Sequence, residues 1–135
     1  MTAATLTMCG IVLLTVVTIE SGGVLLLRIA SDAVPANALQ RTYFRAGHAH
    51  AGVLIILGLV VQLLTSQPGV AAWAGWIGTG VLWAAILLPA GFFLSVLGKD
   101  PQRPNDWRYL IWAGAVSLAI GLVGAAVGLI AAQPA

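Results

Sequence analysis

Four long apolar runs with few charged residues constrain the fold of this chain more than any other feature. The runs cover about residues 6–30, 47–66, 70–97 and 107–132. Each is long enough to cross roughly 30 Å of hydrocarbon as an α-helix. Of the 135 residues, 60% are hydrophobic and 7% are charged, whereas a soluble domain carries roughly a quarter charged residues. The sequence therefore predicts an all-α membrane protein in which residues 1–135 form a single bundle of four transmembrane helices.

The positions of the basic residues predict the orientation of this bundle. The six basic residues all flank the first or the third link between runs: Arg28, Arg41, Arg45, Lys99, Arg103 and Arg108. Because cytoplasmic loops carry an excess of Lys and Arg, loops 31–46 and 98–106 are expected in the cytoplasm and both termini outside. We expect the membrane to be the inner (plasma) membrane of a bacterium. Topology explains cations beside spans, so nucleic-acid binding is excluded.

A short internal echo relates the first and third runs. Residues 20–32 and 88–100 align without gaps and share a glycine, a leucine and an aspartate at matching positions. Each segment is followed by a loop that contains Pro and Arg, and then by an aromatic cluster. Internal similarity of this kind is typical of membrane proteins built from repeated units. The echo predicts two tandem helical hairpins of like orientation.

Glu20 is the leading candidate for a site residue. It lies on the first span about 12 Å deeper than Arg28, at a helical rise of 1.5 Å per residue. An ionised carboxylate is costly at that depth, so we expect it to face the bundle, to be paired or to be protonated. His50 of the second span lies at a similar depth, which predicts an intramembrane Glu20–His50 pair. The alternative is a structural Glu20 that is hydrogen-bonded to a neighbouring helix or to a partner subunit.

Other polar features are expected at the depth of Glu20. Pro89 interrupts the third span, and we expect a helix kink there because proline removes a backbone hydrogen bond. Ser21 and Ser117 lie at similar depth on the first and fourth spans. The sequence thus predicts one polar cluster in the cytoplasmic half of the bundle: Glu20, Ser21, His50 and Ser117.

Both histidines of the chain lie in "RAGHAHAG", residues 45–52. In a regular helix His48 and His50 point about 200° apart, so we expect no shared metal ion and expect His48 to point toward headgroups or another helix. The segment is similar to the "HAH" helix starts of small oxidase-like and cytochrome-like membrane families, which implies a haem b ligand at His48 or His50. Only one span carries histidine, so one chain has no bis-histidine site across two helices. Haem or metal binding stays an alternative, as does proton or ion handling by Glu20 and His50.

Small residues form two adjacent stripes on the fourth span. One stripe has four-residue spacing and the other lies beside it: Ala113, Ser117, Gly121 and Ala125, then Gly124 and Gly128. Small residues let helix backbones approach closely in a membrane. Because two stripes exceed what one helix contact needs, we expect one of them to pack against a partner subunit.

No catalytic motif is present in the sequence. It contains no HExxH, P-loop, GxSxG or CxxC pattern, and Cys9 is expected to be a small buried apolar residue. We therefore expect no enzyme, no cofactor and no metal site. The remaining class is a non-catalytic accessory or assembly subunit of a larger membrane complex, whose partners are the lipid bilayer and other integral membrane subunits.

The apolar spans and two short segments of this chain are similar to those of a group of known proteins. Through its four spans, "RTYFRAGHAHAG" and "LLPAGFF", the chain resembles small four-helix integral membrane proteins of mycobacteria and other actinobacteria. Some proteins of this kind accompany larger assemblies, such as Mce-type lipid-uptake transporters or respiratory supercomplexes. The resemblance implies an accessory role in such a transport or respiratory complex.

Overall fold

The fold was taken from a computed structural model that describes residues 1–132. Over these residues it contains helices and no strand: α1 (Ala3–Ala30), α2 (Ala38–Thr65), α3 (Ala72–Gly78), α4 (Gly80–Leu94), the 3-10 helix η1 (Asp106–Arg108) and α5 (Tyr109–Ala131). Because α3 runs into α4 and η1 into α5, the structure has four helical segments long and apolar enough to cross a membrane. This confirms the predicted all-α four-helix bundle and is consistent with a multi-pass membrane protein.

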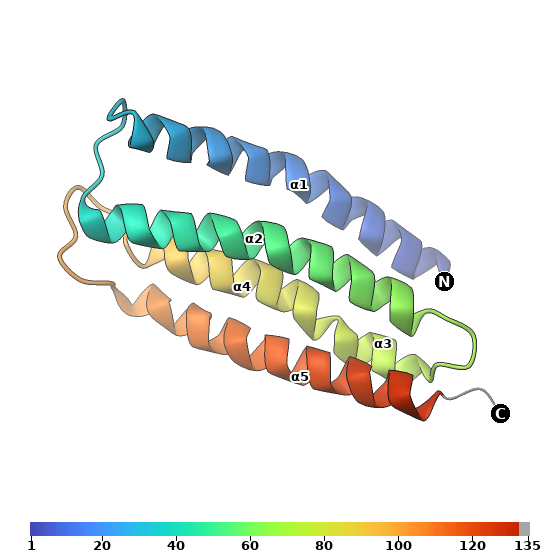
Figure 1. The fold of residues 1–135 in the computed structure, drawn as a ribbon. Coiled ribbons are helices and arrows are strands. Elements are labelled where there is room, and N and C mark those ends of the chain that lie inside the picture. The colour runs from blue at the N-terminus through green and yellow to red at the C-terminus, as the bar shows by residue number, and fades with distance from the viewer. Residues whose placement is uncertain (133–135) are drawn as a thin grey trace.

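The bundle consists of a core of three crossings with a fourth helix on its outside (Figure 1). The core is formed by α2, the α3–α4 pair and α5, whereas α1 packs against α2 alone among the helices. Ile29 is the one residue of α1 that is buried. In the most apolar 18-residue stretch of α1 no residue is buried, compared with 33% in α2 and 39% in α3–α4. Most of the α1 surface therefore faces outward.

The second helix begins at Ala38, well before the apolar run that starts near residue 47. Its start is set by a capping box: the Asn37 side chain accepts from the Gln40 backbone N–H at 2.9 Å, and the Gln40 side chain accepts from the Asn37 backbone N–H at 3.1 Å. The sequence prediction missed the helical turns between Ala38 and residue 47. Hydropathy reports the length of chain that crosses hydrocarbon, whereas a helix can extend beyond that length into polar surroundings.

The third crossing is interrupted at Thr79, and α4 continues as one helix through Pro89. This break in the helix lies ten residues before Pro89, the position at which the sequence predicted a kink. Gly78 and Gly80 flank Thr79, and glycine has low helix propensity. The lack of a side chain at Gly80 also brings its backbone against α5, where the Ser117 hydroxyl donates to the Gly80 carbonyl at 2.8 Å.

The small residues of α5 are mostly used inside the chain. Gly121, Ala125 and Gly128 are buried, and a Cβ added at Gly121 would lie 2.8 Å from the Val81 nitrogen. Gly124 is packed against Ile77. Contrary to the sequence expectation, these stripes therefore hold α5 against α3–α4 and are not left for a partner. Among the six small residues that the sequence placed in the two stripes, Ala113 is the exposed one.

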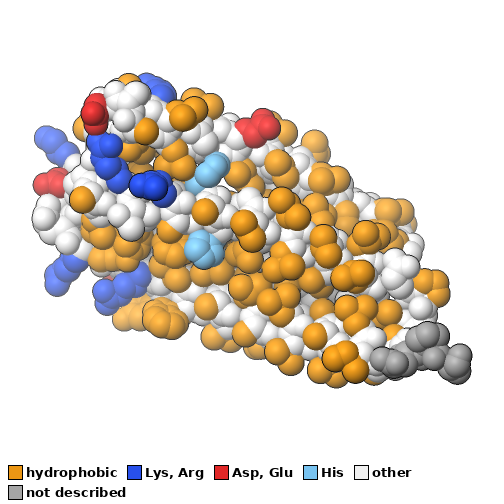
Figure 2. All heavy atoms as spheres, viewed as in Figure 1, with side chains coloured by type: hydrophobic (Ala, Val, Ile, Leu, Met, Phe, Trp, Pro, Cys, Tyr) orange, Lys and Arg blue, Asp and Glu red, His pale blue; other side chains and the backbone are white. Residues whose placement is uncertain are grey.

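The two links that carry the basic residues meet at one end of the bundle, which we call the basic end (Figure 2). The Gln40 amide of α2 donates to the carbonyls of Val96 and Gly98 at 3.1 and 3.0 Å. The Asn37 amide donates to the Asp100 carboxylate at 2.7 Å. These bonds join the α1–α2 hairpin to the α4–α5 hairpin, so the two basic links meet at one end of the bundle, which is consistent with the predicted placement on one side of a membrane.

Candidate functional site: the outer face of α1 and α2

Glu20 lies on the outside of the bundle. Its side chain is exposed, and within residues 1–132 it has neither a hydrogen bond nor an ion pair, since the one ion pair there joins Arg41 to Asp32. The predicted Glu20–His50 pair is therefore wrong. The prediction compared depths along two helices but had no information on the direction in which each side chain leaves its helix.

His50 points away from α1. Its Nδ1 lies 2.7 Å from the Ala46 carbonyl oxygen of its own helix, and its ring lies against Phe92 of α4 with 5.1 Å between ring centroids. His50 is thus satisfied within its own helix, and its side chain is exposed at the surface beside α4.

The remaining members of the predicted polar cluster lie at separate places. Ser21 is exposed and its hydroxyl is 3.5 Å from the Val17 carbonyl of its own helix. Ser117 bonds across to α4, and α5 does not pack on α1. Pro89 is buried in α4. The structure therefore does not bring Glu20, Ser21, His50 and Ser117 together.

His48 is the histidine that faces α1. A Cβ added at Gly22 would lie 3.3 Å from the His48 Nδ1, and one added at Gly23 would lie 3.4 Å from the His48 Cε1. The glycine pair thus lets the imidazole lie directly against the backbone of α1. Because His48 and His50 leave α2 on different sides, they are not arranged to hold one ligand between them.

A pocket of about 360 Å³ opens beside His48, between α1 and α2 at the basic end. Its lining combines small and apolar residues of α1 with three polar residues of α2: Gly23, Leu26, Leu27, Ile29, Ala30, Arg41, Arg45 and His48. The three polar residues follow a spacing of four and then three, which places them on one face of the helix. This spacing is visible in the sequence, whereas the prediction of a site on this helix used only His48 and His50.

Arg41 also closes the link between α1 and α2. Its Nη1 donates to the Ile29 carbonyl at 3.0 Å and its Nε to the Ala36 carbonyl at 3.0 Å. Its Nη2 pairs with the Asp32 carboxylate at 2.6 Å. Asp32 has a positive φ of 56°, so the chain turns sharply there. Arg41 therefore has a structural role in addition to lining the pocket.

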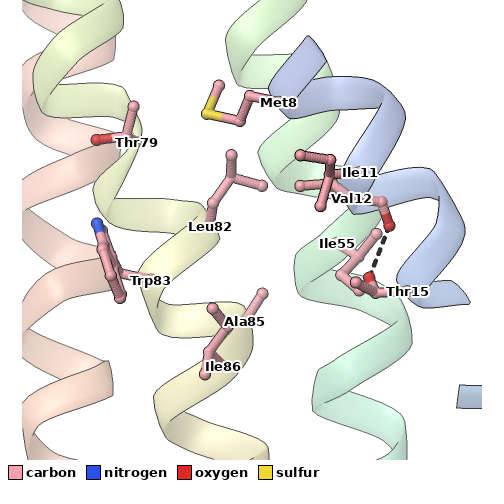
Figure 3. Close-up of a pocket in the computed structure, with 10 residues that line it drawn as sticks. All are labelled: Met8, Ile11, Val12, Thr15, Ile55, Thr79, Leu82, Trp83, Ala85 and Ile86. Atoms are coloured by element: carbon pink, nitrogen blue, oxygen red, sulfur yellow. Dashed lines mark hydrogen bonds between the residues drawn. The ribbon is translucent and has the colours of Figure 1, made fainter. Parts of the chain in front are cut away.

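A second hollow, of about 280 Å³, lies between α1 and α4 on the other flank of α1 (Figure 3). It is lined by Met8, Ile11, Val12, Thr15, Ile55, Thr79, Leu82, Trp83, Ala85 and Ile86. The Thr15 hydroxyl donates to the Val12 carbonyl at 2.6 Å and the Thr79 hydroxyl to the Trp76 carbonyl at 2.6 Å. Because both hydroxyls are engaged by their own helices, this groove is apolar. Glu20 follows Ile11 by nine residues and so lies about 180° around α1 from it.

The architecture defines the class of this protein as a four-helix bundle with the composition of a multi-pass membrane protein. No protein-family model, curated protein or solved structure matches the chain. Among the described residues, no group of three His, Cys, Asp or Glu side chains lies close enough to hold a metal ion. Cys9 is half-buried on α1 and is not part of a disulfide.

Proposed function

We propose that this protein is a non-catalytic assembly subunit of a larger complex in a bacterial inner membrane, and that α1 binds the partner subunit. The observation that carries the proposal is the position of Glu20. A charged side chain near the centre of a transmembrane helix raises the free energy of insertion by about 3 kcal/mol, and we take this value as the guide for a carboxylate on the lipid-facing side. A polar or basic side chain of a partner helix at the same depth would remove that cost by hydrogen bonding.

The packing of α1 supports the same function. This helix is held by α2 alone, and its most apolar stretch has no buried residue. A helix with one neighbour keeps most of its surface available for a second one. The partner proposed is therefore a transmembrane helix that lies along α1 and presents a hydrogen-bond donor to Glu20. The small-residue stripes of α5, which pack within the chain, have no part in this contact.

The proposal includes an orientation in the membrane. By the positive-inside rule, loops 31–46 and 98–106 lie in the cytoplasm, and both termini lie outside. The hydrogen bonds between the two loops support their placement on the same side of the membrane, and the assignment of that side to the cytoplasm rests on the rule alone. A lipid-uptake transporter or a respiratory assembly of an actinobacterium is the kind of complex that the sequence resemblance implies.

The test is a Glu20→Leu substitution in the tagged protein, expressed in its native host and purified in mild detergent. We expect the wild type to retain a membrane protein in stoichiometric amount and Glu20→Leu to lose it. The isolated variant should keep a melting temperature at or above that of the wild type, because the exposed carboxylate has no hydrogen bond or ion pair within the described chain.

The matched control is Thr18→Leu. Thr18 is also an exposed polar residue of α1, and its hydroxyl donates to the Thr15 carbonyl of the same helix at 2.6 Å. This variant should retain the partner. Wild type without a stoichiometric partner, or full retention by Glu20→Leu, would overturn the proposal.

A further inference from the structure

The pocket between α1 and α2 at the basic end has the properties of a ligand site that does not depend on a partner subunit. Its volume of about 360 Å³ falls within the range of roughly 300–1,000 Å³ that is typical of small-molecule pockets. One wall is formed by the α1 backbone at Gly23 and by the side chains of Leu26 and Leu27, and the other by the polar face of α2. Such a pocket suits a ligand with one polar and one apolar part.

The charge that faces the pocket is positive. Arg41 uses three of its N–H groups within the link, one of them on the Asp32 carboxylate, and a guanidinium has five in all. Arg45 and His48 have no hydrogen-bond or ion-pair partner within residues 1–132. Since Arg41 and Asp32 offset each other, the Arg45 guanidinium supplies the uncompensated charge and His48 an additional ring nitrogen.

The position of the pocket along α1 and α2 predicts that it lies at the depth where a lipid changes from headgroup to acyl chain. Arg45 precedes the apolar run of α2, so it is expected at the membrane surface, and His48 lies about one turn deeper. Leu26 and Leu27 continue the pocket wall toward the apolar part of α1. Basic pockets between transmembrane helices on the cytoplasmic side commonly bind anionic lipid headgroups.

We propose that this pocket binds the phosphate of an anionic phospholipid, with Arg45 as the main contact. An arginine can hold two phosphate oxygens at once through its parallel N–H groups. The remaining N–H groups of Arg41 and a ring nitrogen of His48 add hydrogen bonds, and an acyl chain lies against Leu26 and Leu27. The same phosphate chemistry is offered by free inorganic phosphate. A lipid fits better because most of the pocket wall is apolar and belongs to a helix that faces the bilayer.

The test uses the full chain reconstituted in phosphatidylcholine vesicles that contain a trace of spin-labelled phosphatidylglycerol or, separately, spin-labelled phosphatidylcholine. The fraction of motionally restricted label gives the association of each lipid with the protein. We expect the wild type to prefer phosphatidylglycerol several-fold, and Arg45→Gln to reduce this preference about fivefold, as loss of one basic contact implies. Arg28→Gln is the matched control, because Arg28 is an exposed cation of α1 that does not line the pocket. It should keep most of the preference.

A second variant shows whether a lost lipid preference comes from the pocket itself, and not from a change in overall charge or from misfolding. Ala30→Leu enlarges a pocket-lining side chain and keeps every charge, so it should also lower the preference for phosphatidylglycerol. Equal losses in Arg45→Gln and Arg28→Gln would overturn the proposal, as would an unchanged preference in Ala30→Leu. So would displacement of the labelled phosphatidylglycerol by inorganic phosphate at equal ionic strength, which would assign the pocket to the free anion. None of these outcomes depends on the partner proposed for α1.

Discussion

At the scale of single residues, the packing of this bundle depends on which glycines meet a neighbouring helix. Gly121 is buried, and a Cβ there would lie 2.8 Å from the backbone nitrogen of Val81. Gly52 of α2 has no atom within 4 Å of its potential Cβ position. Both are glycines inside apolar helices, and the sequence singles out Gly121 only as a member of a small-residue stripe, without the helix that it meets. The structure makes one a point of close helix approach and the other open to its surroundings.

We predict that Gly121→Ala destabilises the protein while Gly52→Ala does not. The added methyl group at residue 121 meets backbone, which cannot rotate away, so the free energy of unfolding should fall by about 1–3 kcal/mol. At residue 52 the methyl group meets nothing, and the higher helix propensity of alanine should leave the stability unchanged or raise it by up to about 1 kcal/mol. Denaturant unfolding in detergent micelles measures both values. Equal effects of the two substitutions would show that α5 and α4 approach each other less closely.

At the scale of helices and links, the two hairpins are joined by polar side chains at the start of α2. Gln40 is 6% exposed, caps its own helix, and donates to the carbonyls of Val96 and Gly98 in the other hairpin. Hydropathy places this residue in a loop, because it lies outside the apolar run. The contact depends on the ends of two helices meeting, which is a property of the packed bundle.

We predict that Gln40→Ala lowers the free energy of unfolding by about 2 kcal/mol. The substitution removes the side-chain half of the capping box and leaves the buried Val96 carbonyl without this partner. Gln67→Ala is the control, because Gln67 is exposed at the other end of α2 and donates within its own helix end, to Leu63. It should change the stability by less than about 0.5 kcal/mol. Unfolding in detergent, followed by circular dichroism, compares the two. A loss in Gln67→Ala as large as that in Gln40→Ala would contradict the assigned role.

At the scale of the whole molecule, the arrangement is a compact core of three crossings with α1 held on its outside. Both basic links lie at one end and the α2–α3 turn at the other (Figure 1). This arrangement leaves two hollows beside α1, a basic one toward α2 and an apolar one toward α4. It also leaves Glu20 outward. Glu20 and these two hollows thus lie on or beside the helix that packs against only one other helix.

We predict that the two basic links are labelled from the same side of the membrane and the α2–α3 turn from the other. Single cysteines at Ala33, Gln102 and Gln67, which are exposed positions, are introduced after replacement of Cys9 by alanine. A membrane-impermeant thiol reagent applied to intact spheroplasts should label Gln67→Cys alone, and inverted vesicles should give the opposite pattern. Labelling of Ala33→Cys and Gln102→Cys from opposite sides would contradict the bundle, and labelling of both in spheroplasts would reverse the proposed orientation.

The sequence by itself determined the helical class, the number of crossings and the grouping of the basic links on one side. These properties follow from how strongly each short segment prefers hydrocarbon to water, which is local information. Tertiary structure alone decided that the third crossing breaks at Thr79 and that Glu20 and His50 point apart, whereas the start of α2 at Ala38 is set by the local capping box of Asn37 and Gln40. The rotation of a helix about its axis depends on which of its residues pack against its neighbours, as where Gly121 of α5 meets the backbone of Val81. The hydropathy of two helices does not predict a contact of this kind between them, because small residues at the contact are as apolar as their neighbours.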